Sequence, residues 1–362
     1  MKSSTGQYFR SLDHVRALAA FLVFAWHFNH IGGGHYDAPL GVGWSFLTEG
    51  HTGVAIFMTL SGYLFAKLLD GRTVRLTPFL WNRLLRLVPL LVVVIALVAV
   101  DRALRGTLSS GYAVQILRGL VQPTLPNGGW SITVEAHFYV LLPVLLALGA
   151  RNPYALFGVL AAAIALRLAL YLRIGQIQDL AYWTIVGRID QFLCGILAFR
   201  FRAVISGKPG RAALVALAFT LLWWGFDLGG GFYGREDYPS STPVWILVPT
   251  VEGAAYGWLI AWYDDWYTTR HKLRPSSRLS VFVALIGTYS YSIYLLHPFF
   301  VFSIGRAIDA QLITLGERPY LTLVLSLPVF LLMVPIAHLS YRLIELPPMR
   351  FRRGYLGPRT TR

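Results

Sequence analysis

Long apolar stretches constrain this chain more than any other feature. Candidate membrane-spanning segments start near residues 12, 50, 87, 130, 153, 182, 212, 243, 280 and 320. A helix needs roughly 20 apolar residues to cross the hydrocarbon core of a bilayer. Of the 362 residues, 56% are hydrophobic and only 14% are charged, whereas soluble domains carry about a quarter charged residues. The sequence therefore predicts an all-α membrane protein, a single bundle of about ten transmembrane helices.

Three segments affect the predicted number of membrane spans. The apolar run 87–100 is short for a span, and a weaker amphipathic segment at about 108–121 is expected at the interface or against the bundle. The number of spans could therefore be ten or eleven. The stretch 17–28 is as short as a signal-peptide core, but it contains Trp26 and His27 and lacks a small-residue cleavage pattern. We interpret it as a retained first helix.

The placement of lysine and arginine predicts the orientation. With ten spans and a cytoplasmic N-terminus, 21 of these residues face the cytoplasm and eight, among them Arg167 and Arg235, face the other side. This bias predicts that both termini are cytoplasmic. The loop with Arg102, Arg105 and Arg118 runs against the trend.

One membrane domain, residues 1–348, is expected to be followed by a basic cytoplasmic tail, 349–362. The net charge of +15 does not indicate nucleic acid, because the basic residues lie in short runs between apolar segments and form no binding motif. Cys194 is the single cysteine, so an intramolecular disulfide is excluded. No metal is expected, because His27 and His30 lack further ligands at a useful spacing.

Ionisable groups inside a membrane cost several kcal/mol and call for an explanation. Arg16 and His27 are eleven residues apart, which places them about 20° apart around a helix and roughly 16 Å apart along it. Asp13 lies one turn before Arg16 and can pair with it. One face of the first helix thus carries an anion-binding cation and, deeper, a titratable base.

This pair has a functional and a structural interpretation. A histidine with a pKa near neutrality can deprotonate a hydroxyl, and an arginine can hold a phosphate or orient a carboxylate. Alternatively, His27 is satisfied by a neighbouring helix and Arg16 extends to the interface. Either residue alone favours the structural interpretation, whereas both together with the motifs below favour function.

The segment GGWSITVEAHFYVLLP places a carboxylate in an apolar helix. Glu135 shares a helix face with Ser131, near Trp130 and Tyr139. The carboxylate could orient a catalytic imidazole or bind an acceptor hydroxyl. It could equally form an interhelical ion pair with Arg188.

Two later segments also carry polar side chains. In GRIDQFLCG, Arg188 and Asp190 predict a polar network inside the bundle, with a possible substrate contact. In GTYSYSIYLLHP, Tyr291 and His297 lie close to Pro298, which can break a helix and free backbone carbonyls. A structural kink is the favoured role for that segment.

The segment TPFLWNRLLRLVP places Arg83 and Arg86 on one side of a predicted short helix in a cytoplasmic loop. Paired guanidinium groups suit the phosphates of coenzyme A. From charge alone, topology and anionic lipid explain them better. On the other side of the membrane, the loop GGGFYGREDYPSS, with Tyr233 and 235–237, could hold sugar hydroxyls or be merely solvated.

Taken in order, these motifs resemble the acyltransferase-3 family of membrane O-acyltransferases over residues 9 to about 348. The segments that carry the resemblance are FRSLDHVRALAAFLVFAWH, TGVAIFMTLSGYLFAK, FLWNRLLRLVP, WSITVEAHFY, GRIDQFLCG and GTYSYSIYLLHP. Each is weak alone, but six in the right order are specific. The family includes O-acetyltransferases of polysaccharides, Nod factors and macrolides, and other relatives modify peptidoglycan.

The resemblance implies transfer of an acyl group, usually acetyl, from cytoplasmic acyl-CoA to a hydroxyl of a sugar or glycan. It implies that His27 is the catalytic histidine, with Arg16 its essential partner. Arg83 and Arg86 would contact the donor, and Glu135 would lie in the central site. It also implies a multi-pass protein of the bacterial cytoplasmic membrane. The binding hypothesis for the acceptor includes six residues: Trp130, Ser131, Tyr139, Arg188, Tyr291 and His297.

Several alternatives remain open at this stage. His27 could activate the acceptor for direct attack or carry the acyl group itself. The acceptor could be a macrolide or another small molecule, and the oligomeric state is open. A transporter or flippase of a lipid-linked glycan would also use buried polar residues, although no inverted repeat is visible. A non-catalytic scaffold would leave the ionisable residues without a purpose.

Overall fold

The computed structural model describes residues 8–31, 41–234, 238–270, 276–312, 315 and 318–359. The predicted loop residues 235–237 lie outside these ranges. The described elements, in chain order, are α1 (Arg10–Asn29), η1 (Val42–Trp44), α2 (Ser45–Thr48), α3 (Thr52–Leu69), β1 (Arg72–Val74), α4 (Leu76–Leu104), α5 (Ser110–Arg118), α6 (Trp130–Arg151), α7 (Ala155–Ile174), α8 (Gln178–Trp183), α9 (Ile185–Arg200), α10 (Arg202–Ile205), α11 (Pro209–Leu228), η2 (Pro243–Ile246), α12 (Val248–Arg270), α13 (Arg278–Thr288), α14 (Ser290–Gln311), α15 (Pro319–Ser340), η4 (Tyr341–Glu345), η5 (Pro348–Phe351) and β2 (Leu356–Arg359).

Within the described ranges, seven helices are long and apolar enough to cross a membrane: α3, α4, α6, α7, α11, α14, and α15 with η4. The prediction of a helical membrane protein is therefore confirmed, with one two-stranded sheet, β1–β2, in addition to the helices. Helices α1, α9 and α12 occupy three more of the predicted span positions, but α1 and α12 carry charged residues and α9 has only 16 residues. The count of ten spans and the side of the termini stay predictions.

The bundle has an outer wall and a centre. The most apolar 18-residue windows of α4, α7 and α11 are only 17%, 11% and 22% buried, whereas that of α3 is 78% buried. Outer helices present apolar side chains to lipid, so their sequences are apolar all round. Central helices are enclosed by protein and can hold polar side chains, which explains why α1 and α9 have weaker hydropathy.

Helices α3 and α9 approach each other unusually closely. A Cβ atom added to Gly62 would lie 2.0 Å from the carbonyl oxygen of Phe192, and one added to Gly195 would lie 2.0 Å from that of Thr59. Small residues allow helix backbones to come together in membranes. These two glycines therefore set the packing of the central pair.

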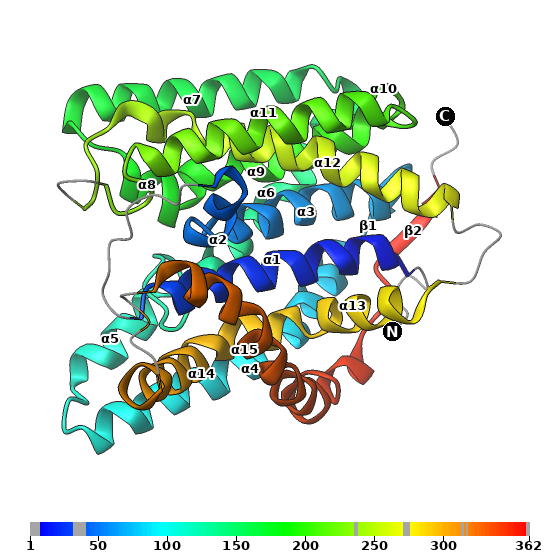
Figure 1. Cartoon of the computed structure of the whole chain (residues 1–362). Helices are drawn as coiled ribbons and strands as arrows, with labels where there is room; N and C mark the ends of the chain where they lie inside the picture. Colours follow the sequence, from blue (N-terminus) through cyan, green and yellow to red (C-terminus); the bar gives the residue numbers. More distant parts are fainter. Residues whose placement is uncertain are drawn as a thin grey trace.

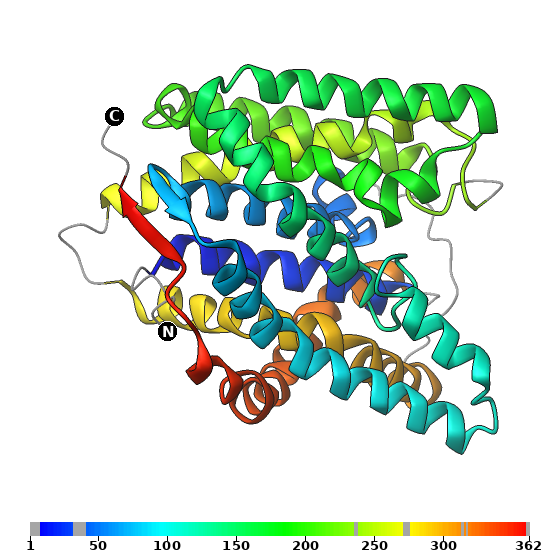
Figure 2. The same ribbon diagram turned by 180° about the vertical axis from the view of Figure 1, so that it is seen from behind.

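Helix α1 crosses the middle of the molecule, between a group that contains α7, α11 and α12 and a group that contains α4, α13, α14 and α15 (Figure 1). Strands β1 and β2 lie at the end of the bundle where α1 begins, as the reverse view also shows (Figure 2). They pair antiparallel, with Arg72 opposite Arg359 and Val74 opposite Leu356. The chain beyond α15 thus returns to the start of α4.

Two local predictions were wrong. Arg83 and Arg86 lie inside the 29-residue helix α4, which continues through Pro89, rather than in a separate short helix. Proline removes one hydrogen bond, and a membrane helix tolerates that when neighbouring groups satisfy the freed carbonyl. Arg167, predicted in an outer loop, lies within α7 and is fully buried, because it has an acidic partner on another helix. Helix α5 confirms the short helix expected near 108–121.

Candidate active site

Three adjoining cavities follow α1 and α3 through the bundle. We name them the arginine pocket (about 130 Å³), the middle pocket (about 100 Å³) and the histidine cavity (about 670 Å³). Arg16, Arg83 and Arg86 line both the arginine and the middle pocket. Val54 and Tyr294 line both the middle pocket and the histidine cavity. The three cavities therefore lie in series, from the end where α1 begins to the end where it stops.

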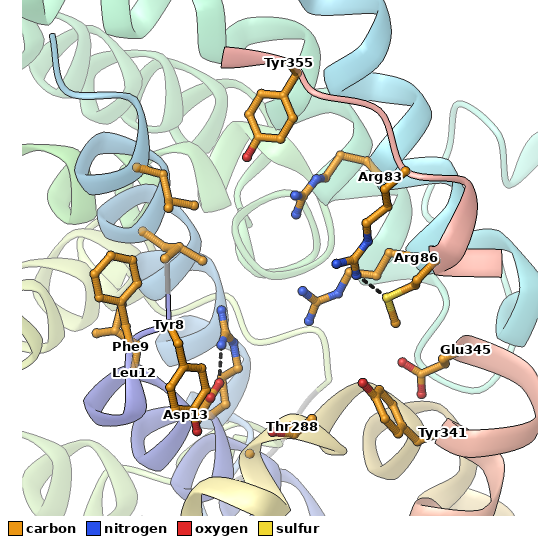
Figure 3. A pocket seen from close by; sticks show the side chains of 16 residues that line it. Tyr8, Phe9, Leu12, Asp13, Arg83, Arg86, Thr288, Tyr341, Glu345 and Tyr355 are labelled. Atoms are coloured by element: carbon orange, nitrogen blue, oxygen red, sulfur yellow. Dashed lines mark hydrogen bonds and ion pairs between the residues drawn. The ribbon is translucent and has the colours of Figure 1, made fainter. Parts of the chain in front are cut away.

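Four guanidinium groups and two carboxylates, those of Asp13 and Glu345, line the arginine pocket. Arg83 and Arg86 point from α4 into the pocket, opposite Asp13 on α1 (Figure 3). Arg16 forms the predicted ion pair with Asp13. Within the described ranges, Arg83, Arg86 and Arg352 form no ion pair. Burial, followed by the nearby charges of Arg86 and Arg83, lowers the pKa of Arg352 to about 10. The pocket is therefore prepared for an anion.

The middle pocket brings together most of the predicted central residues. Ser131, Glu135, Tyr139 and Tyr291 all line it. The hydroxyl of Tyr139 donates to Glu135, and the hydroxyl of Tyr291 donates to the carbonyl of Leu87 at 2.6 Å. The carboxylate thus lies between the arginine cluster and the histidine cavity.

The histidine cavity contains a pair of touching imidazoles. His27 Nδ1 lies 3.1 Å from His297 Nε2 and 2.9 Å from the carbonyl oxygen of Val23, and His297 Nδ1 lies 2.7 Å from the carbonyl oxygen of Tyr294. A carbonyl only accepts, so each Nδ1 carries the proton in the neutral pair. The single Nδ1 hydrogen of His27 is then shared between the Val23 carbonyl and His297 Nε2, which both accept. No described hydrogen bond uses His27 Nε2, which is left as a lone-pair base in a cavity wall.

Aromatic rings form much of the rest of that wall. Trp26, Trp130, Tyr182, Trp183 and Tyr294 line the histidine cavity. The Trp130 and Trp183 rings are 4.7 Å apart and meet edge to face. Such surfaces combine apolar faces with polar edges, so they can hold a ligand that is itself part apolar and part polar. Of the residues predicted for the acceptor, Trp130 and His297 lie here.

Arg167 and Asp190 form a separate polar cluster away from the cavities. Both side chains are 0% exposed, and the guanidinium meets the carboxylate through two bonds of 3.1 and 2.6 Å. Its remaining donors reach the carbonyls of Ile246 and Val186 and the hydroxyl of Thr250. All five guanidinium N–H groups are therefore satisfied. Asp190 thus lies in a polar network inside the bundle, as predicted, but its partner is Arg167 and not Arg188.

Arg188 is also enclosed in the bundle, at 1% exposure, and lines none of the three cavities. It donates to the carbonyl of Tyr182 and to the side chain of Gln191, and it lies 3.9 Å from Glu252. The alternative of an ion pair between Arg188 and Glu135 is therefore not seen in the structure.

Sequence reasoning missed several of these residues. Glu252 could have been found, because it is a charge in an apolar helix like Glu135. The contact between His27 and His297 spans 270 positions, and no local pattern reveals it. Arg352 was assigned to a basic tail, and Tyr294, at the junction of two cavities, was noted only as one tyrosine among several. Arg16 and His27 lie on the same helix but line different cavities.

No cluster of three or more metal-ligating side chains occurs in the part of the chain that the structure describes.

Residues 9–342 match the acyltransferase-3 family of acyltransferase domains, and the chain belongs to this family. It is a membrane acyltransferase. No solved structure matches the protein.

Three bacterial relatives extend this result. BcsY of Komagataeibacter xylinus, whose name describes a membrane-bound transacylase, is 27% identical over 80% of this chain and 72% of its own length. A Staphylococcus aureus (strain COL) protein named as an O-acetyltransferase is 24% identical over 94% of this chain and 57% of its own length. The peptidoglycan O-acetyltransferase OatA of Listeria monocytogenes is 26% identical over 80% of this chain and 49% of its own length. The chain thus spans about half the length of these last two relatives.

Proposed function

We propose that the protein transfers an acyl group, in the first instance acetyl, from cytoplasmic acyl-CoA to a hydroxyl of a sugar or glycan. The observation that carries the proposal is the series of cavities with a cluster of guanidinium groups at one end and a histidine pair at the other. Coenzyme A has its phosphates and its thioester at opposite ends of a long, flexible arm. Arg16 and His27, roughly 16 Å apart along α1, line the first two cavities and the last cavity of this series, respectively.

The donor would enter at the arginine pocket. Arg83 and Arg86 would hold phosphate oxygens through charge-assisted hydrogen bonds, which are shorter and stronger than neutral ones. Arg16 would contribute its remaining donors while Asp13 keeps it oriented. The acyl end would then pass Glu135 and Tyr294 toward the histidine cavity. In this proposal the termini lie on the cytoplasmic side of a bacterial cytoplasmic membrane.

The acceptor would occupy the histidine cavity, between the imidazoles and the aromatic wall. His27 Nε2 takes the proton of the acceptor hydroxyl while the oxygen attacks the thioester carbonyl. The C–S bond breaks, the new ester forms, and the proton passes to the coenzyme A sulfur. His297 acts as a positioning residue, because its Nε2 accepts from His27 Nδ1 and favours the tautomer with a free Nε2. Trp130 would contact the acceptor.

The test is acyl transfer by the protein reconstituted in vesicles with labelled acetyl-CoA and a glycan mixture. Replacing a general base typically costs 10²- to 10⁴-fold in rate, so we expect His27→Ala to lose roughly that much while it still binds coenzyme A. His338→Gln is the matched control, because His338 is a histidine of α15 that lines none of the three cavities. Near-normal transfer by His27→Ala would contradict the proposal.

Two further measurements separate the alternatives. Acid quenching followed by mass spectrometry detects an acyl group on His27 if the histidine carries it covalently, and finds none if transfer is direct. Movement of a lipid-linked glycan without thioester turnover would favour a flippase. Mass spectrometry of surface glycans from a deletion strain identifies the group and the acceptor together, because one acyl mass is lost.

A further inference from the structure

The arginine pocket has a wall that lies outside the part of the chain matched to the family. The match ends at residue 342, yet Glu345, Met349, Arg352 and Tyr355 all line the pocket. Figure 3 shows Tyr355 on the side of Arg83, across the pocket from Tyr8 and Asp13. We call residues 346–359 the C-terminal strap.

The strap is attached to the start of α4 by several independent contacts. Strand β2 pairs with β1, and the backbone N–H of Arg75 donates to the carbonyl of Tyr355 at 2.9 Å. The side-chain amide of Asn82 clamps one residue of the strap: Nδ2 donates to the carbonyl of Arg353 at 2.7 Å, and Oδ1 accepts from its N–H at 2.9 Å. Asn82 is itself buried, at 2% exposure. A segment of this composition would be solvated if it were a free tail, so these contacts give it a defined place.

The clamp lies next to the strap residue with the most unusual surroundings. Arg352 precedes the clamped residue and is half-buried in the pocket beside Arg83 and Arg86. Its described hydrogen bond is to the thioether sulfur of Met349, a weak acceptor, and it has no carboxylate within ion-pair distance among the described residues. Holding a third cation against two others is electrostatically unfavourable unless an anion joins them.

We propose that the C-terminal strap is part of the donor site and that Arg352 binds a phosphate of coenzyme A together with Arg83 and Arg86. The inference rests on the proposed donor. The three guanidinium groups come from two segments, α4 and the strap, which the β1–β2 pairing, the Asn82 clamp and further contacts hold together. The pocket therefore becomes selective for a multiply phosphorylated carrier over its phosphate-free arm.

The experiment measures equilibrium binding of coenzyme A and of pantetheine, which lacks the phosphates, to the full-length protein in detergent. A lost charge-assisted contact corresponds to roughly 10- to 100-fold in the dissociation constant. We expect Arg352→Gln to weaken coenzyme A binding by that factor and to leave pantetheine binding unchanged. Arg350→Gln, an equal change of charge at an exposed position of the same strap, should alter neither.

A second variant tests the clamp. Asn82→Leu should weaken coenzyme A binding, and adding Arg352→Gln to it should have little further effect, because both changes remove the same contact. Unchanged affinity in Arg352→Gln overturns the inference, as does an equal loss for pantetheine, which would indicate a structural role. A wild-type protein that binds no coenzyme A would instead contradict the proposed donor, so the two failures are distinguishable.

Discussion

Arg167 and Arg86 are both cations inside helices long and apolar enough to cross a membrane, but their surroundings are opposite. Arg167 is fully enclosed and makes a two-bond ion pair with Asp190. Arg86 lines two cavities and forms no ion pair within the described ranges. A buried charge that is neutralised holds helices together, whereas one left without a counterion beside an open space is available to a ligand. A charge in a membrane helix therefore indicates that the residue has a role. Whether another residue neutralises that charge indicates whether the role is to hold helices together or to bind a ligand.

The strongest test of this comparison is to remove the partner of Arg167. Asp190→Ala leaves a buried cation uncompensated, which typically costs about 3–5 kcal/mol. We expect a large fall in the thermal unfolding temperature of the detergent-solubilised protein, or loss of folded protein. Asp101→Ala is the control, because Asp101 pairs with Arg105 on the surface, where the side chains are 50% and 60% exposed; exposed pairs contribute about 0–1 kcal/mol. Equal melting of the two variants would show that the buried pair is not structural.

Removing Arg86 should have the reverse effect, a loss of ligand affinity without a loss of stability. Arg86→Gln takes away a proposed phosphate ligand and relieves repulsion from Arg83 and Arg352, so coenzyme A affinity should fall roughly 10- to 100-fold while the unfolding temperature holds or rises. Calorimetry and thermal unfolding of one preparation give both quantities. Arg211→Gln, at an exposed position of α11, controls for the loss of one charge. A destabilised protein with unchanged affinity would place Arg86 with Arg167 instead.

A change in ionic strength should give the smallest difference between accessible and buried charges. Screening shortens the range of electrostatic attraction from about 10 Å at 0.1 M to about 3 Å at 1 M ionic strength, and it acts far more on accessible charges than on buried ones. Between these concentrations, coenzyme A binding should weaken by a few fold, while the unfolding temperature changes little. Donor affinity that is independent of salt would indicate that the guanidinium groups do not bind the phosphates.

Local features of the site could be predicted because they depend on helix geometry alone. Asp13 and Arg16 pair one turn apart, and Ser131 and Glu135 line one pocket from neighbouring turns of α6. The location of Arg83 and Arg86 on one side of a helix was also predicted. The extent of that helix was not, because a short loop helix and a separate span from residue 87 were predicted where one helix, α4, runs through.

Long-range features could not be predicted from one sequence. His27 meets His297 only because α1 and α14 lie side by side, and Arg167 meets Asp190 only because α7 packs on α9. A hydropathy pattern gives the number and approximate position of helices, but it contains no information on which helix faces which. Arg352 is the clearest case, because its sequence context is that of a basic tail.

The amino-acid sequence by itself determined that this protein is a helical membrane bundle, which of its residues are costly in lipid, and to which family its ordered motifs point. Those properties follow from the hydrophobic periodicity of each segment and from the free energy of transferring its side chains from water to lipid. Both can be evaluated within a single segment. Tertiary structure decided which charges are neutralised, which line a cavity, and that a segment beyond the last long helix returns to complete the arginine pocket. Such choices depend on distances between segments far apart in the chain, and only packing fixes those distances.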